Sequence, residues 1–170
     1  MFLRSFLPVR VLVMLVIFGA MLGPGVADAA TTCDSSARPI TCLIPPVAGS
    51  VMVPFDMNAG IYGAGNRGVD FAVVFGDPVM ASADGVVVFS GFVATEQFVT
   101  VVHPNGWRTT YSYLSQRVVA AGQHIAAGQM LGRTSQRFQL GLKIDGAYAD
   151  PAPLFGTAKM HAFLVQRLFG

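Results

Sequence analysis

The chain has 170 residues, a formal net charge of +2 and 53% hydrophobic residues, while charged residues make up only 12%. This length suits one domain, and the near-neutral charge gives no electrostatic basis for nucleic-acid binding, which a basic patch would indicate. The sequence contains two cysteines, too few for a closed structural zinc site with four thiolate ligands.

Residues 1–29 have the pattern of a secretory signal peptide. Arg4 and Arg10 supply the basic start, residues 11–22 form an apolar run, and residues 27–29 fit a small-x-small cleavage site. The apolar run is shorter than the span of about 20 residues that crosses a bilayer. We therefore predict cleavage at the end of this segment and export to the cell envelope, with a retained membrane anchor as the alternative.

Residues 30–50 are predicted to form a Pro-rich N-terminal linker, because prolines and glycines interrupt them and no helical period survives. Cys33 and Cys42 both lie in this segment. Export to an oxidising compartment favours a disulfide between them, although their spacing alone is weak evidence.

From residue 51 to residue 156, short β-branched and aromatic runs alternate with tight turns, which is typical of an all-β domain. Asn105-Gly106 is a strong hairpin signal, and two Gly-Gln pairs at residues 122–123 and 128–129 mark two tight corners. Strands are predicted over residues 51–55, 67–74, 79–83, 86–93, 98–103, 107–114 and 139–144.

The C-terminal segment, residues 157–170, has a different pattern. Apolar residues recur at helical spacing on one side of residues 157–169. We predict a short C-terminal helix whose apolar stripe packs against the β-domain, in preference to a helix that binds a membrane or a partner.

Several segments carry a family resemblance through their order. Residues 66–71 are similar to an HxxxD segment, residues 109–114 to a "tYaHL" strand, and residues 137–141 stand where an HxH motif is expected. Residues 77–87 and 148–151 are similar to the "tPV.Aa.dG.V" and "y.DP" segments. Together they resemble the lysostaphin-like (LytM-type) zinc endopeptidases, which cut peptidoglycan cross-bridges. The resemblance covers residues 51–155 and implies a mostly antiparallel β-sandwich/barrel hybrid of the duplicated hybrid motif type.

In that family, zinc is held by the His and Asp of HxxxD and by the second His of HxH. The corresponding residues here are Asn66, Asp70 and Gln139, so only the aspartate is retained. Two further family histidines that assist catalysis correspond to Tyr113 and Arg137. Neutral amides are weak zinc ligands, and a cation beside the metal position repels it. Although the family implies zinc, we predict neither a metal cofactor nor catalytic residues for this chain. The histidines outside these segments, His103, His124 and His161, lack the spacing of a metal motif.

Arg137 is expected to replace the metal by pairing with Asp70, because a carboxylate buried alone is costly. Asn66 and Gln139 would complete a hydrogen-bonded floor around this pair. The alternative is that Arg137 faces solvent, as most arginines do.

A binding groove is expected near the same positions. Alternation along residues 107–114 places Thr109, Tyr111 and Tyr113 on one face of the strand, and Arg108, Thr110 and Ser112 on the other. Because aromatic and arginine side chains often carry binding energy, Tyr111, Tyr113 and Arg137 are predicted to line the groove.

The resulting functional prediction is a secreted cell-envelope protein whose LytM-like domain is inactive and binds peptidoglycan or regulates a murein hydrolase. It involves no nucleic acid and no membrane span after signal cleavage. Two alternatives stay open: an active peptidoglycan metalloendopeptidase with a rearranged zinc site, and a structural envelope protein with a vestigial groove.

Overall fold

The computed structural model describes residues 32–33, 40–58, 60 and 63–158, and the predicted signal peptide lies outside this range. The strands are β1 (Thr32–Cys33), β2 (Val51–Val53), β3 (Gly68–Phe71), β4 (Pro78–Met80), β5 (Gly85–Val93), β6 (Glu96–Val102), β7 (Arg108–Arg117), β8 (His124–Ile125), β9 (Met130–Ile144), β10 (Ala147–Ala149) and β11 (Thr157–Ala158), and a 3₁₀ helix, η1, spans Ala152–Leu154. The described part of the chain contains no helix of the length and hydrophobicity that a membrane span requires.

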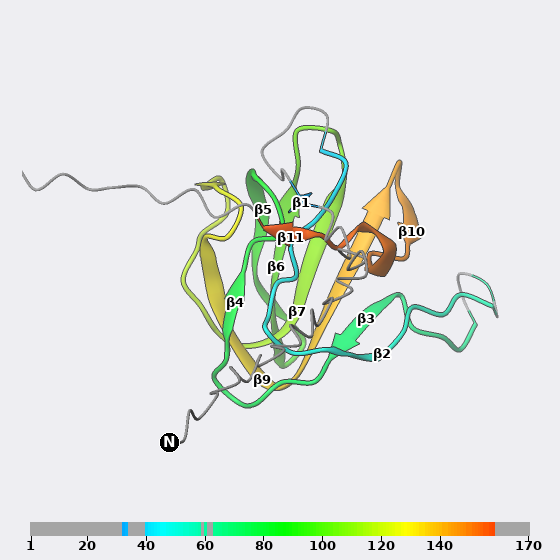
Figure 1. Ribbon diagram of the computed structural model, residues 1–170. Helices are drawn as coiled ribbons and strands as arrows, with labels where there is room; N and C mark the ends of the chain where they lie inside the picture. Colours follow the sequence, from blue (N-terminus) through cyan, green and yellow to red (C-terminus); the bar gives the residue numbers. More distant parts are fainter. Residues whose placement is uncertain (1–31, 34–39, 59, 61–62, 159–170) are drawn as a thin grey trace, which may run out of the picture.

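One sheet contains most of these strands, in the order β2-β3-β9-β7-β6-β5-β8, with β4 and β10 also pairing with β9. All pairings in this sheet are antiparallel, which confirms the predicted mostly antiparallel β fold. Strand β9 is the longest, with 15 residues, and it joins β4 at its start to β3 and β10 at its end. Figure 1 shows β7 running beside β9 through the middle of the molecule.

The core lies on one face of this sheet. Apolar side chains from β3, β4, β5, β6, β7 and β9 form one buried cluster, whose members include Val69, Val87, Val101, Leu131 and Phe138. Along β9, Phe138, Leu140 and Leu142 are buried while Gln139 and Gly141 are partly exposed. This alternation places Gln139 and Gly141 on the opposite, open face of the sheet.

Residues 40–47, which were expected to belong to a linker, pack against the domain. Ile40 and Leu43 are buried, and the Leu43 N–H donates a hydrogen bond of 2.8 Å to the Leu154 carbonyl oxygen. The core therefore begins before residue 51, the predicted start of the domain.

The two cysteines lie at this end of the chain. Cys42 is disulfide-bonded. Its pairing with Cys33 stays a prediction, because the side chain of Cys33 lies outside the part of the chain that is described.

The prediction of a helix from residue 157 is wrong at its start. Residues 157–158 form β11, which pairs in parallel with β1, so tertiary pairing overrides the helical spacing here. Among the residues described near this end of the chain, helical structure is limited to η1, where Asp150 Oδ1 accepts a hydrogen bond of 2.9 Å from the Ala152 N–H. Residues 159–170 lie outside the described range.

A network of buried polar groups lies on the core-facing side of β7. The ring of the buried His103 has Nδ1 at 2.7 Å from the Asp84 carbonyl oxygen and Nε2 at 2.8 Å from Thr109 Oγ1. Thr109 Oγ1 lies 3.3 Å from the Tyr111 hydroxyl, which accepts a hydrogen bond of 2.7 Å from the Ser82 N–H. Burial lowers the pKa of His103, against the opposing effect of its hydrogen bond to Asp84. His103 is therefore a neutral, hydrogen-bonded core residue.

This histidine makes stability depend on pH. Because its folded-state pKa lies below the ordinary 6.5, the unfolded chain takes up a proton first, and stability falls as pH drops below that value. We expect the free energy of unfolding to decrease between pH 7 and pH 5 by up to about 1.4 kcal/mol per pH unit. Urea unfolding at both pH values checks this. A His103→Gln variant should lose part of the dependence and His124→Gln should keep it; equal slopes in both variants would contradict the assignment.

Candidate functional site

Three polar side chains meet where β3 faces β9. Asp70 on β3 stands directly opposite Gln139 on β9 in the strand register. Asn66, just before β3, is fixed by two backbone hydrogen bonds of 2.8 Å to Asp56, one from each N–H. The sheet therefore brings together the three residues that the family resemblance assigns to the zinc-ligand positions. We call them the Asn66–Asp70–Gln139 triad.

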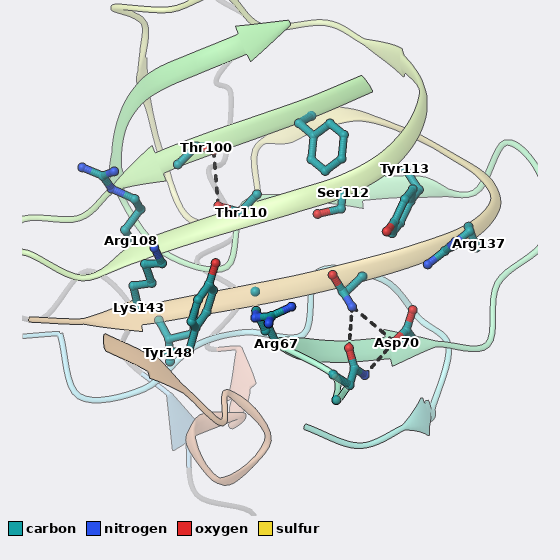
Figure 2. Close-up of a pocket in the computed structure, with 16 residues that line it drawn as sticks. Arg67, Asp70, Thr100, Arg108, Thr110, Ser112, Tyr113, Arg137, Lys143 and Tyr148 are labelled. Carbon is teal, nitrogen blue, oxygen red and sulfur yellow. Dashed lines mark hydrogen bonds between the residues drawn. The ribbon is translucent and has the colours of Figure 1, made fainter. Parts of the chain in front are cut away.

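The triad is closed by hydrogen bonds among its own members. Asn66 Nδ2 donates to Asp70 Oδ2 at 2.7 Å and to the Pro54 carbonyl oxygen at 3.1 Å. Gln139 Nε2 donates to Asn66 Oδ1 at 2.5 Å and lies 3.4 Å from Asp70 Oδ2. Figure 2 shows these bonds as a triangle at one side of the groove. Both amide groups thus direct N–H donors toward the carboxylate.

A close approach of two backbones makes this triangle possible. A Cβ atom at Gly68 would lie 2.4 Å from the Leu140 carbonyl oxygen on β9, a distance that side-chain carbons do not adopt. Glycine at this position therefore lets β3 pair tightly with β9 and brings Asp70 within reach of Gln139.

The triad lies in a groove with a volume of about 570 Å³. Its floor consists of outward-facing residues of β6, β7 and β9, and its charged side chains are mostly cationic. The residues that line it are Gly65, Asn66, Arg67, Asp70, Phe98, Thr100, Arg108, Thr110, Ser112, Tyr113, Arg137, Gln139, Gly141, Leu142, Lys143 and Tyr148.

Tyr113 reaches this groove because β7 is irregular at that point. The register with β9 shifts between Ser112 and Leu114, and Tyr113 has φ = 64°, in the left-handed region. Such a backbone costs about 1–3 kcal/mol for a residue other than glycine. The bulge turns the Tyr113 ring out of the face that alternation gives it and places it beside Phe98, with ring centroids 5.7 Å apart.

Tyr111 follows the regular alternation, and its prediction as a groove residue is wrong. Its side chain is fully buried in the core, with its hydroxyl bonded to the Ser82 N–H. Thr109 and Tyr111 share the face of β7 that points into the core, and Tyr113 leaves that face for the groove.

Arg137 stacks on Tyr113, which corrects the expected pairing with Asp70. Its guanidinium carbon lies 3.6 Å from the centroid of the Tyr113 ring, while the triad amides are the donors bonded to the carboxylate. The side chain of Arg137 is exposed, in agreement with the alternative that it faces solvent. The physical reason is that Asn66 already supplies a short hydrogen bond to Asp70, and the aromatic face offers Arg137 an attractive contact.

Comparison with known proteins identifies this arrangement. Residues 64–142 match Peptidase family M23. The chain contains an M23 domain. The match includes the triad, Tyr113 and Arg137, and thus the whole region in which the family places its metal.

Relatives of the M23 domain agree with this identification. This chain is 39% identical to the peptidoglycan DD-endopeptidase ShyA of Vibrio cholerae over 70 residues, which cover 41% of this chain and 16% of ShyA. It is 28% identical to the murein hydrolase activator NlpD of Salmonella typhimurium over 125 residues, which cover 69% of this chain and 32% of NlpD. The structure of Helicobacter pylori Csd3 aligns with a TM-score of 0.62 and 25% identity, covering 70% of this chain and 34% of Csd3. The chain spans about a third or less of the length of the curated relatives it matches.

The residues of the M23 domain do not fit the zinc ion that the family normally holds. Asp70 is the one anionic donor of the triad, and both amides present N–H groups, which cannot ligate a cation, toward its carboxylate. Within the residues that the structure describes, no group of three or more His, Cys, Asp and Glu side chains is placed to hold a metal.

Sequence reasoning missed the cationic residues of the groove. Arg108 and Lys143 are direct partners in the β7–β9 register, and Lys143 Nζ lies 4.4 Å from the centroid of the Tyr148 ring. The available signal was the alternation along β7, which grouped Arg108 with Thr110 and Ser112. That grouping is right, and this is the face that lines the groove.

Proposed function

We propose that the M23 domain of this chain is a catalytically inactive binding module of the cell envelope, which holds peptidoglycan or a murein hydrolase in its groove. The observation that carries the proposal is the Asn66–Asp70–Gln139 triad, in which both amide N–H groups are directed at the Asp70 carboxylate at the ligand positions. Without a bound metal, the site has no activated water of pKa near 7 to attack a peptide bond. A groove that can hold a ligand but not hydrolyse it suits recognition or regulation.

Features of the groove support binding. At one end, Arg137 lies over the Tyr113 ring and Phe98 packs against that ring at an angle of 54°. Such aromatic and arginine groups commonly dominate binding energies. Tyr113 is held there by a strained backbone, and strain of this kind tends to occur at functional sites. The relationship to NlpD, which is named a murein hydrolase activator, favours a regulatory role within the cell wall.

Export completes the proposal. The signal-like pattern of residues 1–29 supports secretion, and the disulfide at Cys42 is consistent with an oxidising compartment. The proposed location is therefore the cell envelope, outside the cytoplasmic membrane.

Co-sedimentation with purified peptidoglycan, and with a murein hydrolase as bait, tests this function. Tyr113→Ala and Arg137→Ala should each reduce retention of the chain by about tenfold, the effect of losing about 1.4 kcal/mol of binding energy. Phe92→Ala is the matched control, because Phe92 is also stacked under an arginine, Arg117, but lies outside the groove.

Two results would contradict the proposal. Hydrolysis of peptidoglycan that chelators abolish would favour an active metalloendopeptidase. Retention of no ligand, or equal retention by Tyr113→Ala, Arg137→Ala and Phe92→Ala, would favour a structural protein with a vestigial groove.

A further inference from the structure

The floor of the groove is built as a ladder of paired residues on β7 and β9. Arg108 faces Lys143 in the first rung, Thr110 faces Gly141 in the second, and Ser112 faces Gln139 in the third. Beyond the third rung, the Tyr113 bulge carries the stacked Arg137. Figure 2 shows Arg108 and Lys143 at one end of the groove, Tyr113 and Arg137 at the other, and Thr110 and Ser112 between them.

The first rung places two positive charges directly opposite each other. Like charges at facing positions destabilise an antiparallel pair. Lys143 rests on the ring of Tyr148. No ion pair with a carboxylate joins Arg108, Lys143 or Arg137 to another residue of the described chain. Each of these cations therefore keeps a positive charge that an incoming anion can neutralise.

The groove itself contains little negative charge to compete for these cations. Asp70 is the one acidic residue that lines it, against Arg67, Arg108, Arg137 and Lys143. Its carboxylate already accepts hydrogen bonds from the amides of Asn66 and Gln139. Since the whole chain has a net charge of only +2, this lining concentrates positive charge in one place.

The separation of the cations sets the size of the ligand. Ser112 precedes the Tyr113 bulge on which Arg137 rests, so it marks that end of the groove. It lies four residues from Arg108 on β7, about 13 Å at the rise of an extended strand. One small anion cannot contact both ends at that distance. An extended peptide spans it with about four residues. The side chains of Thr110 and Ser112 line the groove between the ends, and the Thr110 hydroxyl pairs with that of Thr100 at 3.3 Å.

We infer that the groove recognises an extended acidic peptide, with one carboxylate held by Arg108 and Lys143 and a second held near Arg137. The inference rests on the proposed function and specifies the ligand of the same groove. The carboxylates could belong to a cell-wall peptide or to an acidic segment of a partner protein, since both present the same chemistry.

Fluorescence anisotropy with the full chain tests the inference. The probe is the labelled pentapeptide Glu-Ala-Glu-Ala-Glu, whose first and last glutamates are four residues apart. Its control is the same peptide with glutamine in place of each glutamate. At low ionic strength we expect the glutamate peptide to bind at least about tenfold more tightly, and Arg108→Gln and Lys143→Gln each to weaken it about tenfold. Arg133→Gln removes the same charge from β9 outside the groove and should change the affinity by less than about twofold.

Equal affinity for the two peptides, or equal weakening by Arg133→Gln, would overturn the inference. So would inorganic triphosphate that binds as tightly as the glutamate peptide, since a compact anion would then suffice. The peptidoglycan and hydrolase assays separate this inference from the proposed function. If Arg108→Gln and Lys143→Gln retain their partners fully and no acidic peptide binds, the inference fails and the function stands. If the acidic peptide binds through these residues and no envelope partner is retained, the function fails and the inference stands.

Discussion

The variant that carries both Asn66→His and Gln139→His should bind one zinc ion per chain, whereas the unmodified chain should not. The strand register already places Asp70 opposite residue 139, and hydrogen bonds of 2.5 and 2.7 Å show that the three side chains converge. Two imidazoles and a carboxylate form a set of three protein ligands that suits zinc, with a position left for water. We expect affinity for zinc to rise by at least about 100-fold, measured by isothermal titration calorimetry.

A third substitution supplies the control for this gain. Adding Asp70→Ala to the double variant should abolish the new zinc binding, because two imidazoles alone make an incomplete site. If the double variant keeps its β-sheet circular dichroism spectrum and yet gains no zinc affinity, the triad is not at the former metal position.

Gly68→Ala should destabilise the domain more than the same change at its partner in the register. The new methyl group would lie 2.4 Å from the Leu140 carbonyl oxygen, and this backbone atom cannot move without opening the β3–β9 pair. We expect the free energy of unfolding to fall by about 2–3 kcal/mol, at the upper end of overpacking costs. Urea denaturation followed by circular dichroism measures the change.

Gly141→Ala is the matched control, since Gly141 faces Gly68 in the strand register. A methyl group there would meet the Arg67 carbonyl oxygen at 3.5 Å, an ordinary contact. Its effect should remain within about 1 kcal/mol. Similar losses from both variants would mean that the close approach at Gly68 does not limit the packing of β3 on β9.

The positions of β2 to β7 along the chain could be predicted from the sequence because turn chemistry is local. The Gly-Gln corners have the conformation that their residues indicate: Gly122 and Gly128 have φ = 86° and 76°. Gln123 and Gln129 each close their turn by accepting a hydrogen bond from the backbone N–H three residues earlier. Such features depend on a few neighbouring residues, which the sequence shows directly.

The errors at the site arise where tertiary contacts decide the geometry. The bulge at Tyr113 separates it from Tyr111, and simple alternation cannot show where a strand is irregular. The sequence-based expectation for Arg137 was either a pairing with Asp70 or a position in solvent, and its contact with the Tyr113 ring was not predicted. In the structure, Asn66 Nδ2 donates to the Asp70 carboxylate and the Arg137 guanidinium lies over the Tyr113 ring.

We propose that the Asn66–Asp70–Gln139 triad, which its own hydrogen bonds close, excludes zinc from the ligand positions. Equilibrium dialysis of the unmodified chain against zinc, followed by elemental mass spectrometry, tests it most directly. We predict far less than one zinc ion per chain at micromolar free zinc, unchanged by Asp70→Ala. One zinc ion per chain that is lost in Asp70→Ala would contradict the claim.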